Sequence, residues 1–275
     1  MQPGIYHTLI IRRQTSVGFY LSDGKDDVLL PTKYCPQKAE IGSQLAVFVY
    51  LDQMNRPVAT TLNPYAIVGD FAFLRVAHAN EFGAFLDWGL EKDLFVPFAE
   101  QSVAMEINKR YFVYIHWDEQ SSRLMASSNT DRYLSKDPFP YAVGDEVNLI
   151  LGNRSPLGYQ VIIEKKFKGI VYHSEVFDSL RPGDPTRGFI HQIRPDGKVD
   201  VRLKPDGVQA IEGDAEVLYS LLKRHHGFIA LTDSSEPEQI KTVAHMSKKA
   251  FKRAVGSLYK AHKITLEPNG IRLVD

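Results

Sequence analysis

Aromatic side chains occupy alternate positions in short apolar runs of this chain, where they could stack on flat ring systems. In residues 82–86 (FGAFL), the alternation of a β-strand puts Phe85 on the face opposite to Phe82. In residues 94–97 (LFVP), it puts Phe95 opposite to its aliphatic neighbours. An outward aromatic ring can stack a nucleic-acid base and contribute about 1–3 kcal/mol with little sequence preference. We therefore expect Phe85 and Phe95 to form a stacking surface, and Phe82 to lie in the core.

Two tyrosines occupy related positions in other parts of the chain. Tyr20 lies in the run 17–21 (VGFYL), at the place that Phe85 has in 82–86. Tyr172 is the outward aromatic residue of the run 169–175 (GIVYHSE). We expect both to contact bases. The alternative is that these outward rings are buried against a neighbouring domain or a protein partner.

Basic residues near the C-terminus form a second candidate surface. Ser247 can cap a helix over about 248–262, and no acidic residue falls between Lys241 and Lys263. At 100° per residue the basic side chains gather opposite an apolar face made of Ala250, Phe251, Ala254, Val255, Leu258 and Tyr259. We expect them to neutralise phosphates in a salt-dependent manner, although a solvated helix face would show the same pattern. They are Lys249, Lys252, Arg253, Lys260 and Lys263.

Catalytic and metal-binding patterns are weak in this sequence. The one cysteine, Cys35, lies in no nucleophile motif, and His225-His226 has no further ligand at metal spacing. His116-Trp117-Asp118 is most simply a structural segment at a strand end. The acidic residues are scattered over turns, and no glycine-rich phosphate loop occurs. We expect no catalytic residue, no metal and no cofactor.

Composition bounds the cellular setting. The chain has 275 residues, a net charge of zero and 44% hydrophobic residues, so nucleic-acid binding would need local basic patches. No apolar run is long enough to span a membrane, and the N-terminus lacks the features of a signal peptide. We expect a cytoplasmic protein without membrane contact; the sequence does not indicate an oligomeric state.

The elements that would position these residues form three weak repeats. Gly18, Gly83 and Gly158 begin similar apolar runs, and each copy ends with a turn followed by a short strand. About five short strands in about 60 residues are typical of a small closed barrel such as the OB-fold. After residue 208 the apolar period changes to that of helices, which are expected near 215–222, 236–244 and 248–262 before a hairpin of 263–266 and 271–274. That order is typical of a winged helix.

The second repeat resembles an S1 domain, an RNA-binding OB-fold. Residues 83–89 (GAFLDWG) are similar to that family's Gly-Ala-Phe-Val-Asp-Tyr-Gly stretch, and 169–175 to its Gly-Leu-Val-His-Ile-Ser-Glu stretch. Three such repeats before a winged helix that contains 246–253 (MSKKAFKR) resemble the conserved virulence factor B family of Gram-positive bacteria. That resemblance implies RNA binding and post-transcriptional control, including control of virulence genes in pathogens, without catalysis.

The expected architecture is therefore mainly β with a C-terminal α+β domain. It consists of S1-type OB-fold barrels at 1–64, 65–136 and 141–206 and a winged helix at 209–275. We expect single-stranded RNA as the partner. Leu29, Pro31 and Gln160 depart from a strongly aromatic surface, which predicts modest affinity spread over several domains. Alternatives are a transcription regulator that holds duplex DNA through the winged helix, a scaffold on the ribosome or RNA polymerase, and, last, a nuclease.

Overall fold

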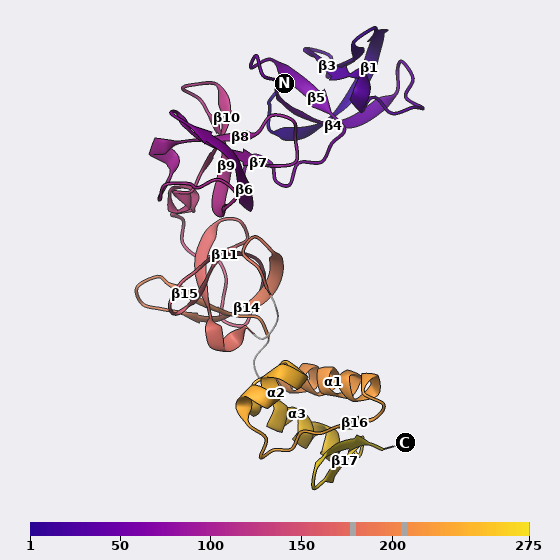
Figure 1. The fold of residues 1–275 in the computed structure, drawn as a ribbon, viewed down its shortest axis with the longest axis vertical. Helices are drawn as coiled ribbons and strands as arrows, with labels where there is room; N and C mark the ends of the chain where they lie inside the picture. The colour runs from indigo at the N-terminus through magenta and orange to yellow at the C-terminus, as the bar shows by residue number, and fades with distance from the viewer. Residues whose placement is uncertain (177–179, 205–207, 275) are drawn as a thin grey trace. The chain divides into compact units, whose positions relative to one another are not determined.

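The computed structural model describes residues 1–176, 180–204 and 208–274 (Figure 1). The chain separates into two compact units, Met1–Ser135 and Lys136–Asp275. The first unit contains two closed five-stranded barrels, and the second contains a third barrel followed by helices and a three-stranded sheet. The mainly β architecture with a winged-helix end is thus confirmed. The predicted end of the third barrel at residue 206 falls within residues 205–207, which lie outside the described ranges.

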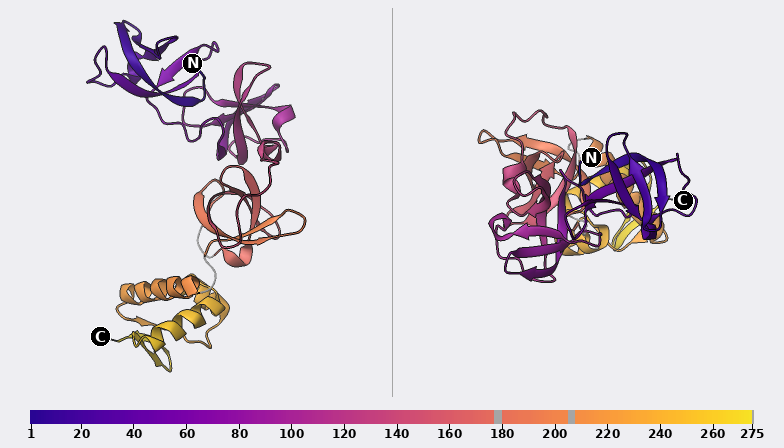
Figure 2. Two further views of the ribbon diagram at one scale, coloured as in Figure 1. Left: turned by 180° about the vertical axis from the view of Figure 1, so that it is seen from behind. Right: turned by 90° about the horizontal axis from the view of Figure 1, so that it is seen from above.

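The three barrels share one strand order, in which the third and fifth strands pair in parallel to close the sheet. Their closed outlines can be followed in both ribbon views (Figures 1 and 2). The first barrel consists of β1 Ile5–Thr15, β2 Gly18–Ser22, β3 Asp27–Pro31, β4 Gln44–Leu51 and β5 Pro57–Thr60. The second consists of β6 Phe71–Asn80, β7 Gly83–Asp87, β8 Leu94–Pro97, β9 Arg110–Asp118 and β10 Arg123–Ser127. The third consists of β11 Glu146–Arg154, β12 Gly158–Ile163, β13 Phe167–Tyr172, β14 Pro185–Ile193 and β15 Val199–Arg202.

The repeated glycine has the same structural reason in every barrel. Gly18, Gly83 and Gly158 each pair with the last residue of the next strand. A Cβ atom at any of the three would lie less than 3.0 Å from a backbone carbonyl oxygen of that strand. Only glycine allows the two strands to approach this closely, so the repeat marks a requirement of the barrel.

The long first strand of each barrel, β1, β6 or β11, was not located from the sequence. Its pairing with the second strand shifts register within the strand, between Ile11 and Arg13 in β1 and between Val76 and His78 in β6, with a similar shift in β11. Such a bulge inserts a residue and interrupts the two-residue alternation. The two-residue pattern that identifies a strand is therefore interrupted at the bulge.

The first two barrels share an apolar junction. The fully buried ring of Phe48 from β4 packs edge-on against Trp88, with ring centroids 5.7 Å apart. Both belong to one continuous core cluster with Tyr50 and Leu86. A backbone hydrogen bond joins the two domains as well, since the N–H of Val68 donates to the carbonyl of Gly4 at 2.9 Å. The junction therefore fixes the β4–β5 turn of one barrel beside the β7–β8 loop of the other.

The C-terminal domain consists of α1 Val208–Arg224, β16 Phe228–Ile229, α2 Pro237–Ala244, α3 Lys248–Lys260, β17 Ile264–Glu267 and β18 Gly270–Leu273. The predicted cap is confirmed, because the Ser247 side chain accepts a hydrogen bond from the backbone N–H of Ala250 at 3.1 Å. The short strand β16 was not predicted; it joins the hairpin in a sheet of order β16-β18-β17. None of the helices in the described part of the chain is long and apolar enough to cross a membrane.

One prediction about the core of this domain is wrong. Tyr259 was assigned to the apolar face of α3, but 53% of its surface is exposed. The other predicted core residues of α3 are buried: Ala250, Phe251, Ala254, Val255 and Leu258. Tyr259 lies in the last turn of the helix, at the edge of the stripe that packs against the core, so its ring extends past the covered area.

Candidate nucleic-acid interface

Two phenylalanines form the centre of an aromatic surface on the second barrel. Phe85 in β7 and Phe95 in β8 are direct register partners, and their ring centroids are 5.0 Å apart. Their strand neighbours Ala84, Leu86 and Val96 are buried in the barrel, whereas both rings are only half-buried. Alternation thus places the two rings outside the core, as predicted.

A histidine that the sequence did not reveal extends this surface. The ring of His78 stacks on Phe85 with a centroid distance of 4.3 Å and an interplanar angle of 9°. His78 follows the bulge of β6 and pairs with Phe85 across the strands. Its Nδ1 lies 3.2 Å from a carboxylate oxygen of Asp93, which fixes the ring plane. We call His78, Phe85 and Phe95 the aromatic platform.

Phe82 lies outside the core, contrary to the sequence-based prediction. Its side chain is 65% exposed. The strand β7 begins only at Gly83, whose φ of +152° differs from that of an ordinary strand residue. The alternation therefore does not extend back to Phe82, whose N–H instead donates to the side chain of Asn80 at the end of β6 at 2.9 Å.

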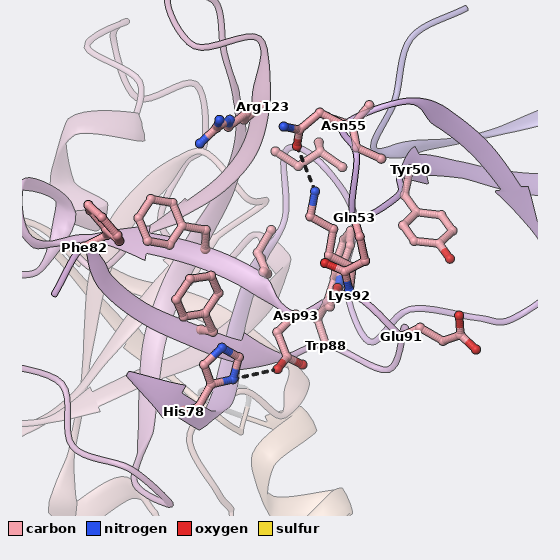
Figure 3. A pocket seen from close by; sticks show the side chains of 15 residues that line it. Tyr50, Gln53, Asn55, His78, Phe82, Trp88, Glu91, Lys92, Asp93 and Arg123 are labelled. Atoms are coloured by element: carbon pink, nitrogen blue, oxygen red, sulfur yellow. Dashed lines mark hydrogen bonds and ion pairs between the residues drawn. The ribbon is translucent and has the colours of Figure 1, made fainter. Parts of the chain in front are cut away.

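The aromatic platform lines one side of a groove of about 460 Å³ (Figure 3). Residues of the first barrel line the other side. We use the name groove for the space bounded by Tyr50, Leu51, Gln53, Asn55, His78, Phe82, Phe85, Trp88, Glu91, Lys92, Asp93, Leu94, Phe95, Arg123 and Leu124. A volume of this size, with aromatic rings on one side and amides and cations on another, suits a nucleotide-sized ligand.

The first barrel has a reduced version of the platform. Tyr20 pairs with Leu29 at the register of Phe85 and Phe95, so one aromatic ring stands where the second barrel has two. Arg13 covers that ring, with its guanidinium carbon 4.1 Å from the ring centroid. Tyr20 is thus an available but partly covered stacking surface.

The third barrel has no aromatic pair at this register. Gln160 pairs with Ile170 there. Tyr172 pairs with Gly158, so it stands two residues further along β13, at the place of Pro97 in the second barrel. Its hydroxyl accepts a hydrogen bond from Arg194, which also forms an ion pair with Asp200. Tyr172 is therefore oriented by the barrel itself.

The predicted basic face of α3 is exposed, but one of its residues, Arg253, forms an ion pair within the domain. Lys249, Lys252 and Lys260 are exposed. Arg253 instead forms an ion pair of 3.1 Å with the buried carboxylate of Asp214 in α1, so this face has an acidic partner although no acidic residue falls between Lys241 and Lys263. Asp214 lies 39 residues earlier in the chain, so the local sequence could not show it.

Lys263 follows the helix and remains exposed, with its ammonium group 5.2 Å from the ring centroid of Tyr219. The ammonium group of Lys223 lies 4.5 Å from the centroid of the same Tyr219 ring. The exposed cations therefore continue from α3 onto α1.

Two other side chains that the sequence singled out, Cys35 and His116, lie against their own barrels. The Cys35 thiol donates to the carbonyls of Leu30 and Pro31 at 3.5 and 3.4 Å. His116 lies against the ring of Tyr133, with centroids 5.1 Å apart. Within the described ranges, no group of three His, Cys, Asp or Glu side chains is arranged to hold a metal ion.

Comparison with known proteins identifies both kinds of domain. An S1 domain model matches residues 3–62, and a model of the CvfB-like winged helix domain matches residues 216–273. The chain is 28% identical to the uncharacterized protein YitL of Bacillus subtilis over 97% of this chain and 92% of that protein. It is 25% identical to Conserved virulence factor B of Staphylococcus aureus, covering 85% of this chain and 80% of that protein.

A solved structure from Streptococcus pneumoniae, described as a multidomain protein with nucleic acid binding domains, is also similar. It is 22% identical, covers 98% of this chain and 97% of its own, and has a TM-score of 0.42. The family models and the named relatives confirm the resemblance seen in the sequence.

Proposed function

This chain is a relative of the conserved virulence factor B proteins, with an S1 domain and a CvfB-like winged helix domain, and from that premise we propose that it is a non-catalytic protein that binds single-stranded RNA. The observation that carries the proposal is the aromatic platform on the second barrel. Phe85 and Phe95 are half-buried and His78 is exposed, and the ring of Phe85 contacts both of the others. Unpaired bases stack on such a surface, whereas the bases of a duplex are covered by their neighbours.

The remaining candidate residues would extend the RNA contacts beyond the aromatic platform to the other domains. Tyr20 and Tyr172 would add weaker contacts on the first and third barrels. Lys249, Lys252, Lys260 and Lys263 would hold phosphates, and Arg253 would act mainly through Asp214. Several weak sites on one chain raise the effective concentration of each for a long RNA. The biological role that fits is post-transcriptional regulation of gene expression, including virulence genes in a pathogen.

The test is an equilibrium titration with labelled single-stranded RNA, matched single-stranded DNA and duplex DNA at two salt concentrations. The Phe85→Ala/Phe95→Ala variant should lose at least tenfold in RNA affinity, since each stacked base contributes about 1–3 kcal/mol and about 1.4 kcal/mol is tenfold. The matched control is Gln160→Ala/Ile170→Ala, which truncates the same register pair in the third barrel. RNA recovered after the titration should be intact when Mg²⁺ is present.

Three results would contradict the proposal. Preference for duplex DNA would favour a transcription regulator that acts through the winged helix. Failure to bind any nucleic acid would favour a protein scaffold. RNA binding that Phe85→Ala/Phe95→Ala leaves unchanged would remove the aromatic platform from the interface.

A further inference from the structure

The groove beside the aromatic platform is built by two barrels, and one lysine joins them. Lys92 belongs to the β7–β8 loop of the second barrel. Its ammonium nitrogen donates to the side-chain oxygen of Asn55 at 2.9 Å (Figure 3). It also donates to the backbone carbonyl of Asp52 at 2.7 Å, and both residues lie in the β4–β5 turn of the first barrel. An ammonium group has three donors, so one remains for a ligand in the groove.

The position of Lys92 is set by the packed junction behind it. The indole N–H of Trp88 donates to the backbone carbonyl of Lys92 at 2.7 Å. Trp88 in turn is buried against Phe48 of the first barrel. The lysine is therefore held at the groove by both barrels before any ligand arrives, which lowers the entropic cost of binding.

The carboxylates at the groove all have partners within the protein. Glu91 forms an ion pair with Lys33, and this hydrogen bond holds the pKa of Glu91 below its usual value. Asp93 lies against His78 at 3.2 Å. The side chain of Asp52, the residue whose backbone carbonyl accepts from Lys92, forms an ion pair of 2.8 Å with Arg56. Lys33 and Arg56 therefore already neutralise Glu91 and Asp52, and Asp93 is in contact with the imidazole of His78.

Two cations remain at the groove. Burial lowers the pKa of Lys92, and the charge of Arg123 lowers it further against the opposing effect of Asp52. Arg123 is exposed and, among the described residues, forms no ion pair or side-chain hydrogen bond. Two like charges held near one another are stabilised by an anion placed between them.

We propose that the groove is a single RNA site shared by the two barrels, in which Lys92 and Arg123 bind one phosphate while the adjoining base stacks on the aromatic platform. The exposed amide of Gln53 and the free N–H groups of Asn55 face the same space and donate to the sugar or base of the next nucleotide. The first barrel thus completes the site of the second. The inference rests on the proposed RNA binding and adds the phosphate position and the contribution of the β4–β5 turn.

The test uses the full chain and a single-stranded oligouridylate, titrated at several salt concentrations. For Lys92→Gln/Arg123→Gln we expect about a tenfold loss of affinity. The slope of log K against log salt should become shallower by about 0.7, the value for one phosphate contact on a single strand. Lys109→Gln is the control, because Lys109 is an exposed cation of the second barrel that is paired with Glu106 outside the groove. It should leave both quantities unchanged.

A second variant separates binding from folding, because Lys92 also joins the barrels. Gln53→Ala removes an exposed amide of the first barrel and should weaken RNA binding about threefold without shifting the melting temperature. The inference is overturned if both groove variants bind as the wild type does while Phe85→Ala/Phe95→Ala weakens binding; the proposed function then stands. It is also overturned if affinity falls with no change in salt slope. If the platform variant is unchanged as well, both proposals fail.

Discussion

The second and third barrels have the same framework and different surfaces. Each closes five strands in the same order, bends its first strand with a bulge and places a glycine against the carbonyl of the next strand. At the register where the second barrel pairs Phe85 with Phe95, the third pairs Gln160 with Ile170. The barrel backbone therefore requires glycine at its position but accepts different side chains at the outward pair. Repeats of this fold can thus differ in binding at the outward pair.

The glycine that both barrels share predicts the largest effects, which are losses of stability. Gly83→Ala and Gly158→Ala should each destabilise their barrel by about 3 kcal/mol, because the added Cβ would overlap a carbonyl oxygen of the paired strand. Thermal unfolding followed by calorimetry would measure the loss. Gly197→Ala is the control: Gly197 has φ +79° but open space around the Cβ position, so only backbone strain of about 1 kcal/mol is expected. Equal losses at Gly197 and Gly158 would show that the close approach of the strands is unimportant.

The difference between the outward pairs of the second and third barrels predicts the next largest effect, a gain in RNA affinity. Gln160→Phe/Ile170→Phe would give the third barrel the pair that the second already has. The added rings should improve affinity for single-stranded RNA about tenfold, corresponding to one stacked base at about 1–3 kcal/mol. Fluorescence anisotropy with a short oligonucleotide would measure the gain. An unchanged affinity, with the fold intact by circular dichroism, would mean that an outward aromatic pair is insufficient for binding.

The winged helix allows a similar separation of stability from binding. Arg253→Ala should cost about 1 kcal/mol of stability, since it removes one partner of the buried Asp214 carboxylate while Lys204 remains 3.2 Å away. Lys249→Ala should leave stability unchanged and reduce only the salt dependence of nucleic-acid binding. Urea unfolding and salt titrations of the two variants distinguish these roles. The same stability for both variants would contradict the structural role of Arg253.

The smallest effect should come from the edge of the platform. His78→Ala removes the ring stacked on Phe85 and should reduce RNA affinity by about 1 kcal/mol, close to fivefold. Arg13→Ala tests the corresponding place in the first barrel, where the guanidinium covers Tyr20. There we expect RNA affinity to stay the same or rise slightly as the ring becomes accessible. A larger loss for Arg13→Ala than for His78→Ala would move the main site to the first barrel.

Local patterns in the sequence were sufficient for the repeats, the outward Phe85 and Phe95, the capping Ser247 and the winged-helix order. They failed where the chain leaves its regular period or where partners lie far apart. The bulge in β6 hid His78, and the late start of β7 at Gly83 misplaced Phe82. The contact of Lys92 with Asp52 spans 40 residues and depends on how two barrels pack, which alternation within one strand cannot encode.

The most direct test of RNA binding by the second barrel is ultraviolet crosslinking of the full chain to a single-stranded uridine-rich RNA, with the attached residues located by mass spectrometry. We expect crosslinks at Phe85, Phe95 and His78, with weaker ones at Tyr20 or Tyr172. Crosslinks confined to α3 and the C-terminal hairpin, with none in residues 78–97, would contradict the proposal that the aromatic platform binds RNA.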